Sequence, residues 1–198
     1  MPRRLIFTLG VALLLSVAGC TSTRPFTDAG GRVIPGSIAT MEQVLIGGIS
    51  QSIWFRGVDT RRPAIILLHG GPGSSESALF RHYDAALEKH FLMVYWEQRG
   101  TGRSYHSDIP RASMTIAQFE RDLDVVVDLV RQRFGKNKVI LLGRYDWQVP
   151  SVLAEQYFNT IDAPCKRLIW FEQSAHNPPF EEPGRFVHVM VDDVLPLA

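Results

Sequence analysis

Short apolar runs that alternate with helical patterns are the strongest constraint on the fold of this chain. Residues 63–68, 91–96 and 139–142 are continuously apolar or nearly so, which is typical of strands buried on both faces of a sheet. Helical spacing of apolar residues follows the first run in residues 77–89 and the second in residues 115–134. Strands that alternate with helices form a parallel sheet covered on both faces. The pattern therefore predicts an α/β fold.

The helix expected after the second run has clear start and stop signals. Thr115 and Gln118 have the spacing of a capping box, and Gly135 follows the last apolar position. Four further elements are expected. They are two short strands in residues 41–55 around a Gly-Gly pair, a helix over 150–158, a strand over 166–171 and a helix over 183–194.

A glycine-rich turn, His69-Gly70-Gly71-Pro72-Gly73, directly follows the first apolar run. Glycine lets the backbone approach a substrate closely. Its N–H groups can also stabilise the oxyanion that develops during acyl transfer. A purely structural tight turn is the alternative interpretation of this segment alone.

A second motif follows the second apolar run. Residues 96–104 read Trp-Glu-Gln-Arg-Gly-Thr-Gly-Arg-Ser. With the glycine-rich turn, this segment resembles the proline iminopeptidase-like branch of the α/β-hydrolase superfamily, where the motif usually begins with Asp at the position of Glu97. The resemblance implies that Gly70 and Gly71 form the oxyanion hole, and that residues 96–104 shape the site, braced by Arg99, without taking part in the chemistry.

Two later segments resemble the acid and histidine segments of the same family. Residues 143–150 place Asp146 as the triad acid, and residues 172–176 place His176 as the triad base. The resemblance implies that Asp146 orients the imidazole, while His176 acts first as a general base and then as a general acid. Taken alone, Asp146 could instead cap a helix and His176 could be an ordinary loop residue.

The serine nucleophile is missing from this framework. α/β-Hydrolases present it in Gly-x-Ser-x-Gly, on a sharp turn between a strand and a helix. The segments centred on Ser50, Ser75 and Ser104 all lack the second glycine. Cys165 lies in no such motif and is interpreted as a small filler residue.

The position of the loss can be inferred from the third apolar run. In the family this strand leads into the serine turn, whereas here Gly143 continues directly into the acid segment. We infer that two similar strand ends are joined near residues 141–144, so that the serine turn and the helical cap are deleted. The predicted fold class is a truncated α/β-hydrolase fold, a mostly parallel sheet with helices on both faces and no cap domain, in an incomplete core over residues 41–198.

The N-terminal residues predict export and lipidation. Arg3 and Arg4 precede an apolar stretch over residues 5–18 that is short for a membrane span but typical of a signal peptide. The stretch ends in Val-Ala-Gly-Cys20, which resembles the lipobox of bacterial lipoproteins. We expect a signal peptide over residues 1–19, lipid attachment at Cys20 and a tether over residues 20–40. The alternative is an ordinary signal peptide with a chance cysteine.

Composition narrows the possible partners. Removal of residues 1–19 takes away two of the 21 basic side chains and none of the 20 acidic ones, leaving 19 basic against 20 acidic. This balance does not predict a nucleic-acid partner, and nothing in the sequence predicts a metal ion or a cofactor. The expected partners are a small peptide or ester substrate, by resemblance, and a membrane, reached through the lipid. The residue after Cys20 is not Asp, which favours the outer membrane, facing the periplasm, in a host that has one.

Three functions remain open from the sequence. The first is a serine hydrolase of aminopeptidase or esterase type that is inactive as it stands. The second is a noncatalytic lipoprotein that keeps the scaffold for binding. The third is a gene remnant with no function of its own.

Overall fold

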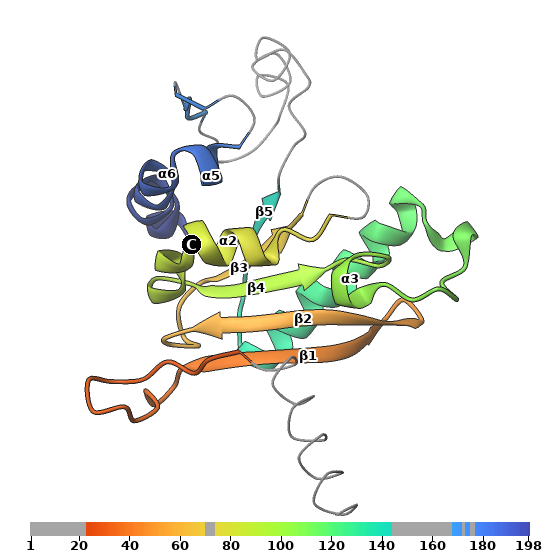
Figure 1. Cartoon of the computed structure of the whole chain (residues 1–198), viewed down its shortest axis with the longest axis horizontal. Coiled ribbons are helices and arrows are strands. Elements are labelled where there is room, and N and C mark those ends of the chain that lie inside the picture. The colour runs from red at the N-terminus through yellow and green to blue at the C-terminus, as the bar shows by residue number, and fades with distance from the viewer. Residues whose placement is uncertain (1–22, 70–73, 144–167, 172, 175–176) are drawn as a thin grey trace, which may run out of the picture.

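The described part of the chain is built around one five-stranded sheet (Figure 1). The computed structural model describes residues 23–69, 74–143, 168–171, 173–174 and 177–198. The strands stand in the order β1-β2-β4-β3-β5. Their bounds are β1 Ile38–Ile46, β2 Ile49–Gly57, β3 Ala64–Leu68, β4 Leu92–Glu97 and β5 Ile140–Gly143.

The sheet is mixed. β1 and β2 form an antiparallel hairpin, and β2 pairs antiparallel with β4. β3 is parallel to both of its neighbours, β4 and β5, so the predicted parallel arrangement is confirmed for these three strands. They all end at the same side of the sheet, called here the carboxyl end, where Leu68, Glu97 and Gly143 lie. The opposite side, where Ala64, Leu92 and Ile140 lie, is called the amino end.

Both faces of the sheet are buried along β3 and β4, as their continuous apolar runs predict, whereas Leu141 of β5 is 47 % exposed. Ile66 and Val94 face a cluster that includes Val126 and Val130 of helix α3 (Ile116–Phe134). The residues next to them point the other way, because side chains alternate across a strand. They join a second cluster with helices α2 (Ser77–Tyr83) and α6 (Pro183–Val189), containing Ile65, Met93, Phe80 and Phe186. The chain therefore has a helix layer on each side of the sheet.

Helix α3 begins and ends where the sequence predicts. The Thr115 hydroxyl accepts the Gln118 N–H at 3.2 Å, and Gly135 closes the helix with a left-handed φ of 63°. The capping box is only half formed. The Gln118 side-chain oxygen, which in a capping box accepts the N-cap N–H, instead accepts a hydrogen bond from Arg121 at 2.6 Å, and its amide N–H donates to the buried carboxylate of Asp122 at 2.8 Å.

Two elements differ from the sequence predictions. The expected single helix over 77–89 is instead α2 followed by a 3₁₀ helix, Ala85–Lys89, with a break at Asp84. The strand expected over 166–171 is wrong for its described part, residues 168–171, which form no strand. There the Trp170 carbonyl accepts a hydrogen bond from Arg185 at 2.6 Å, and Phe171 packs against Phe186, so contacts with α6 outweigh the strand propensity of a short apolar run.

The C-terminal helix is confirmed, with a change of winding. Helix α5 (Pro178–Glu181) precedes α6, which continues as one π-helical stretch, Met190–Val194, and a 3₁₀ turn, Leu195–Leu197. The helix expected over 150–158 lies outside the described residues. No helix in the described residues is long and apolar enough to cross a membrane.

Asp84, at the break after α2, gives the stability of the fold a pH dependence. Its side chain is 1 % exposed, and neither carboxyl oxygen has a hydrogen-bond partner among the described residues. Burial raises the pKa of Asp84 from 3.8 to about 7. The folded protein therefore holds this proton more tightly than the unfolded chain, and the free energy of unfolding falls as the pH rises from about 4 to about 7.

We predict that Asp84→Asn removes this part of the pH dependence, because the amide has the same shape and does not ionise. Urea unfolding at pH 4.5 and pH 8 should show a smaller loss of stability in the variant than in the parent chain. Asp59→Asn is the matched control. Hydrogen bonds from Arg61 lower the pKa of Asp59 to about 2, so its titration lies below this range. Equal losses in the parent chain and Asp84→Asn would contradict the prediction.

Candidate functional site

His69 connects the two loops that leave the carboxyl end of the sheet. Its Nε2 accepts the backbone N–H of Gln98 at 3.0 Å and lies 3.1 Å from the Thr101 hydroxyl. In return, the side-chain amide of Gln98 donates to the backbone carbonyl of His69 at 3.2 Å. A nitrogen that accepts a backbone N–H carries no proton, so the ring is neutral and protonated at Nδ1. We conclude that His69 fixes the loop after β3 onto the loop after β4.

Glu97 makes a second connection between the same loops. Its carboxylate accepts the Ser75 hydroxyl at 3.1 Å and the Arg103 N–H at 2.6 Å, and the Arg103 guanidinium lies 3.5 Å away. The side chain is 2 % exposed. A Cβ added at Gly102 would lie 2.6 Å from a Glu97 carboxylate oxygen, so this close approach requires glycine. Glu97, which stands where the family that the motif resembles usually has aspartate, is thus fully used in bracing.

Neither Ser75 nor Ser104 in these loops is arranged as a nucleophile. The Ser104 hydroxyl donates to the Glu97 carbonyl, accepts the Ser52 N–H at 2.7 Å, and is fully buried. The Ser75 hydroxyl donates to Glu97, whose carboxylate is already paired with Arg103. Within the described ranges, no histidine contacts either hydroxyl, and so the serine–histidine pair needed for activation is not formed there.

A buried ion pair holds the loop after β4 from the other side. Arg99 donates to both carboxylate oxygens of Asp122, at 2.6 and 3.0 Å, and to the Gly47 carbonyl at 3.2 Å. Arg99 and Asp122 are 1 % and 0 % exposed. A pair this deep stabilises a fold only if the remaining polar atoms are also satisfied.

That condition is met by two glutamines. Gln51 and Gln118 donate to different oxygens of Asp122, each at 2.8 Å, and Gln51 accepts the Trp96 indole N–H at 2.9 Å. The network joins the β1–β2 hairpin, β4 and α3 at one point. The prediction that Arg99 braces the second motif is confirmed.

Sequence reasoning missed Asp122, although a signal for it was present. Asp122, Val126 and Val130 are four residues apart on α3, and all three are buried. A carboxylate in line with core valines predicts a buried cationic partner. The contribution of Gln51, from a distant strand, has no comparable signal in the sequence.

The predicted catalytic and lipid-attachment residues, Gly70, Gly71, Asp146, His176 and Cys20, lie outside the described residues. The strand register still fixes the positions from which the glycine-rich turn and the acid segment begin. Leu68 of β3 is paired with Gly143 of β5. The glycine-rich turn and the acid segment therefore leave the sheet from adjacent strands at the carboxyl end, where open α/β sheets bind ligands.

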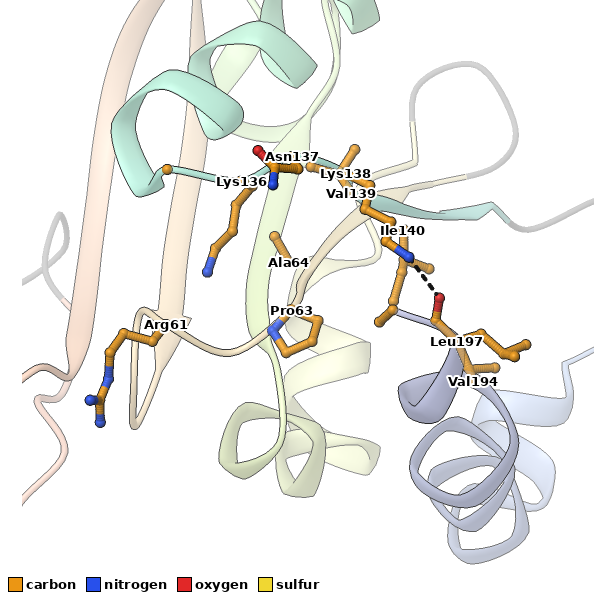
Figure 2. A pocket seen from close by; sticks show the side chains of 12 residues that line it. Arg61, Pro63, Ala64, Lys136, Asn137, Lys138, Val139, Ile140, Val194 and Leu197 are labelled. Atoms are coloured by element: carbon orange, nitrogen blue, oxygen red, sulfur yellow. Dashed lines mark hydrogen bonds between the residues drawn. The ribbon is translucent and has the colours of Figure 1, made fainter.

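A groove of about 440 Å³ lies at the amino end instead (Figure 2). Its walls come from the turn before β3, the end of α3, the start of β5 and the last residues of the chain. They comprise Arg61, Pro63, Ala64, Gly135, Lys136, Asn137, Lys138, Val139, Ile140, Val194, Leu197 and Ala198. Because it lies at the end of the sheet opposite the two loops, the groove is separate from the candidate site. Among the described residues, no group of three His, Cys, Asp or Glu side chains could hold a metal ion.

Comparison with known proteins points to hydrolases. A probable aminopeptidase of Bacillus subtilis (strain 168) is 41 % identical over 118 residues, covering 60 % of this chain and 36 % of the relative. The mouse serine hydrolase BPHL is 29 % identical over 137 residues, or 68 % of this chain and 44 % of that protein. The relatives of this chain are α/β-hydrolase superfamily members. No family model matches the chain.

The similarity is partial in length. The chain spans 36 to 44 % of the curated relatives that it matches. Among solved structures, a proline iminopeptidase-related protein of Thermus thermophilus aligns with a TM-score of 0.46 and 25 % identity, over 54 % of this chain and 36 % of that protein.

The ion-pair network makes a sharp prediction for two neighbouring glycines. Gly47 and Gly48 both have positive φ, 55° and 82°, so alanine is strained at either position. Only at Gly47 would the new Cβ meet the network, at 2.1 Å from Asp122 and 2.6 Å from Arg99. We expect Gly48→Ala to cost about 1–2 kcal/mol, the cost of a left-handed conformation for an L-residue, and Gly47→Ala to cost about 3–5 kcal/mol, the range for breaking a buried ion pair. Chemical denaturation measures both. Similar costs for the two variants would show that Arg99 and Asp122 do not hold this turn.

Proposed function

We propose that this chain is an incomplete α/β-hydrolase of the proline iminopeptidase-like branch, which retains the framework for acyl transfer to water but has lost the serine nucleophile. The observation that carries the proposal is the end of β5. This strand lies beside β3, whose loop is fixed by His69, yet it continues from Gly143 into Arg144-Tyr145-Asp146 and not into a serine turn. The sequence similarity to the Bacillus subtilis aminopeptidase supports the family assignment.

In the complete form of such a site, the roles follow from the chemistry. A serine at the end of the β5 strand would attack the acyl carbon, and His176 would take the hydroxyl proton and later deliver it to the leaving group. Asp146 would hold the imidazole in the tautomer that accepts this proton. Backbone N–H groups at Gly70 and Gly71 would stabilise the oxyanion. The substrate class, by family, is a small peptide with a free amino end or an ester.

The chain as it stands should have little or no activity. When a triad residue is removed, the oxyanion hole and substrate binding alone leave about 10³–10⁴-fold acceleration over water in a well-formed site. Here the deletion also takes away the cap that builds the substrate pocket in this family. We propose that the protein is exported and held at a membrane by lipid on Cys20, with the outer membrane favoured in a host that has one.

A fluorophosphonate probe tests the loss of the nucleophile. We expect no covalent labelling of the full chain, assayed beside an active serine esterase as the positive control. The Ser75→Ala/Ser104→Ala variant should show the same absence of labelling as the parent chain, because both hydroxyls are hydrogen-bonded in bracing and neither is a nucleophile. Labelling of the parent chain that disappears in this variant would refute the proposal.

Two further measurements separate the alternatives. Reading the DNA across the codons for residues 141–144 distinguishes a true deletion from an assembly error. Isothermal titration with small peptides and peptide amides tests whether the scaffold binds without catalysis. Saturable binding with no turnover would identify a binding lipoprotein, whereas neither binding nor turnover would identify a remnant.

A further inference from the structure

The described part of the segment expected to be a tether, residues 23–40, is bound to the domain. Arg56, near the end of β2, donates to the Thr23 hydroxyl and to the Arg24 carbonyl at 2.9 Å, and its guanidinium lies 4.7 Å from the centre of the Phe26 ring. Further along, the Thr60 N–H donates to the Gly36 carbonyl at 2.9 Å. These contacts fix both ends of residues 23–37 against the body of the protein.

The position of these contacts decides which side of the domain the N-terminus approaches. Arg56 pairs in register with Met93, one residue from the start of β4. Thr23 therefore lies at the amino end of the sheet. Only Thr21 and Ser22 stand between it and Cys20, and three residue steps span at most about 11 Å. A lipid on Cys20 would hold the amino end close to the bilayer surface.

The same side of the protein is basic. Three loops meet there, residues 23–37, 58–63 and 135–139, and together they contain six basic and two acidic side chains. The loops are contiguous, because residues 36 and 60 are hydrogen-bonded and residues 61, 136 and 138 line the same groove. The two acids, Asp28 and Asp59, are already paired within their own loops.

Four basic side chains on this surface form no salt bridge within 4 Å to a carboxylate in the described part of the chain: Arg24, Arg62, Lys136 and Lys138. Arg62 and Lys136 feel the charge of Asp59, whose closest partner is Arg61. Arg24, Arg62 and Lys138 are exposed, and Lys136 is partly so. Lys138 donates to the Leu197 carbonyl at 3.1 Å, as Figure 2 shows. The lining of the groove itself contains no Asp or Glu. We name these four residues the basic surface.

From this placement we infer that the basic surface docks on anionic phospholipid headgroups, so that the carboxyl end, with the loops held by His69 and Glu97, faces away from the membrane. The inference rests on the proposed lipid attachment at Cys20. Electrostatic attraction adds to a lipid anchor, since each basic side chain near an anionic surface strengthens binding about fivefold. One lipid signal and one basic surface together give stable and oriented attachment.

The length of α3 allows the orientation to be measured. The helix has 19 residues, which corresponds to about 28 Å, and it runs from the carboxyl end to the amino end. A fluorophore on Asn137→Cys reports on the amino end, and one on Arg111→Cys reports on the loop before α3. Both residues are exposed. Each is labelled in the lipidated full chain with Cys165→Ser, and the chain is inserted into phosphatidylcholine vesicles with or without phosphatidylglycerol.

Quenching by spin-labelled headgroups is the readout. We expect strong quenching at position 137 and little at position 111, provided that phosphatidylglycerol is present. Raising the salt to about 0.5 M should remove the difference. Lys136→Glu/Lys138→Glu should also remove it, whereas Arg111→Glu/Arg121→Glu, which reverses two charges on the other side, should not change the signal at position 137. Equal quenching at both positions, or quenching that is independent of anionic lipid, would overturn the inference.

Failure of the lipid anchor can be recognised separately. Flotation with vesicles lacking phosphatidylglycerol tests the anchor alone, and the mass of the Cys20 peptide tests lipidation. The unlipidated full chain, Cys20→Ser, should still bind phosphatidylglycerol vesicles. Adding Lys136→Glu/Lys138→Glu to Cys20→Ser should weaken this binding at least tenfold. Absence of that binding would refute the basic surface itself. Displacement by 10 mM inorganic phosphate at constant ionic strength would also refute it, in favour of a small-anion site in the groove.

Discussion

The ion pair between Arg99 and Asp122 is the interaction on which the arrangement of the candidate site depends. It joins the loop after β4 to α3 and, through Gly47 and Gln51, to the β1–β2 hairpin. Burying two charges is costly unless every remaining donor and acceptor is satisfied. Here the supporting bonds come from side chains that are far apart in sequence. The loop is consequently held in one position by elements on both sides of it, and His69 and Glu97 transmit that position to the neighbouring loop.

Much of the fold could be predicted from the sequence, because its signals are local. Continuous apolar runs marked β3, β4 and β5, and Thr115 and Gly135 marked the ends of α3. The failures occurred where tertiary contacts decide. Asp84 interrupts a stretch that has helical spacing throughout, and residues 168–171 pack on α6 and not in the sheet.

The candidate site, like the fold, was predicted from the sequence only in part. The interpretation of residues 96–104 as a charged turn braced by Arg99 is confirmed by the ion pair with Asp122. The partner itself, and the connection from Ser75 to Glu97, depend on how separate loops approach one another. The predicted oxyanion glycines and the acid–histidine pair stay predictions, since those residues lie outside the described ranges.

The described partners of the Arg99–Asp122 ion pair all lie in one part of the sequence, and this bears on how such a chain could arise. Among the described residues, all the partners of the ion pair fall between Gly47 and Asp122, and none of them follows the proposed junction near residues 141–144. A gene can therefore lose the segment after β5 without removing any group that positions these loops. These contacts hold the framework together without any of the predicted catalytic residues, so the presence of the framework alone does not identify an active enzyme.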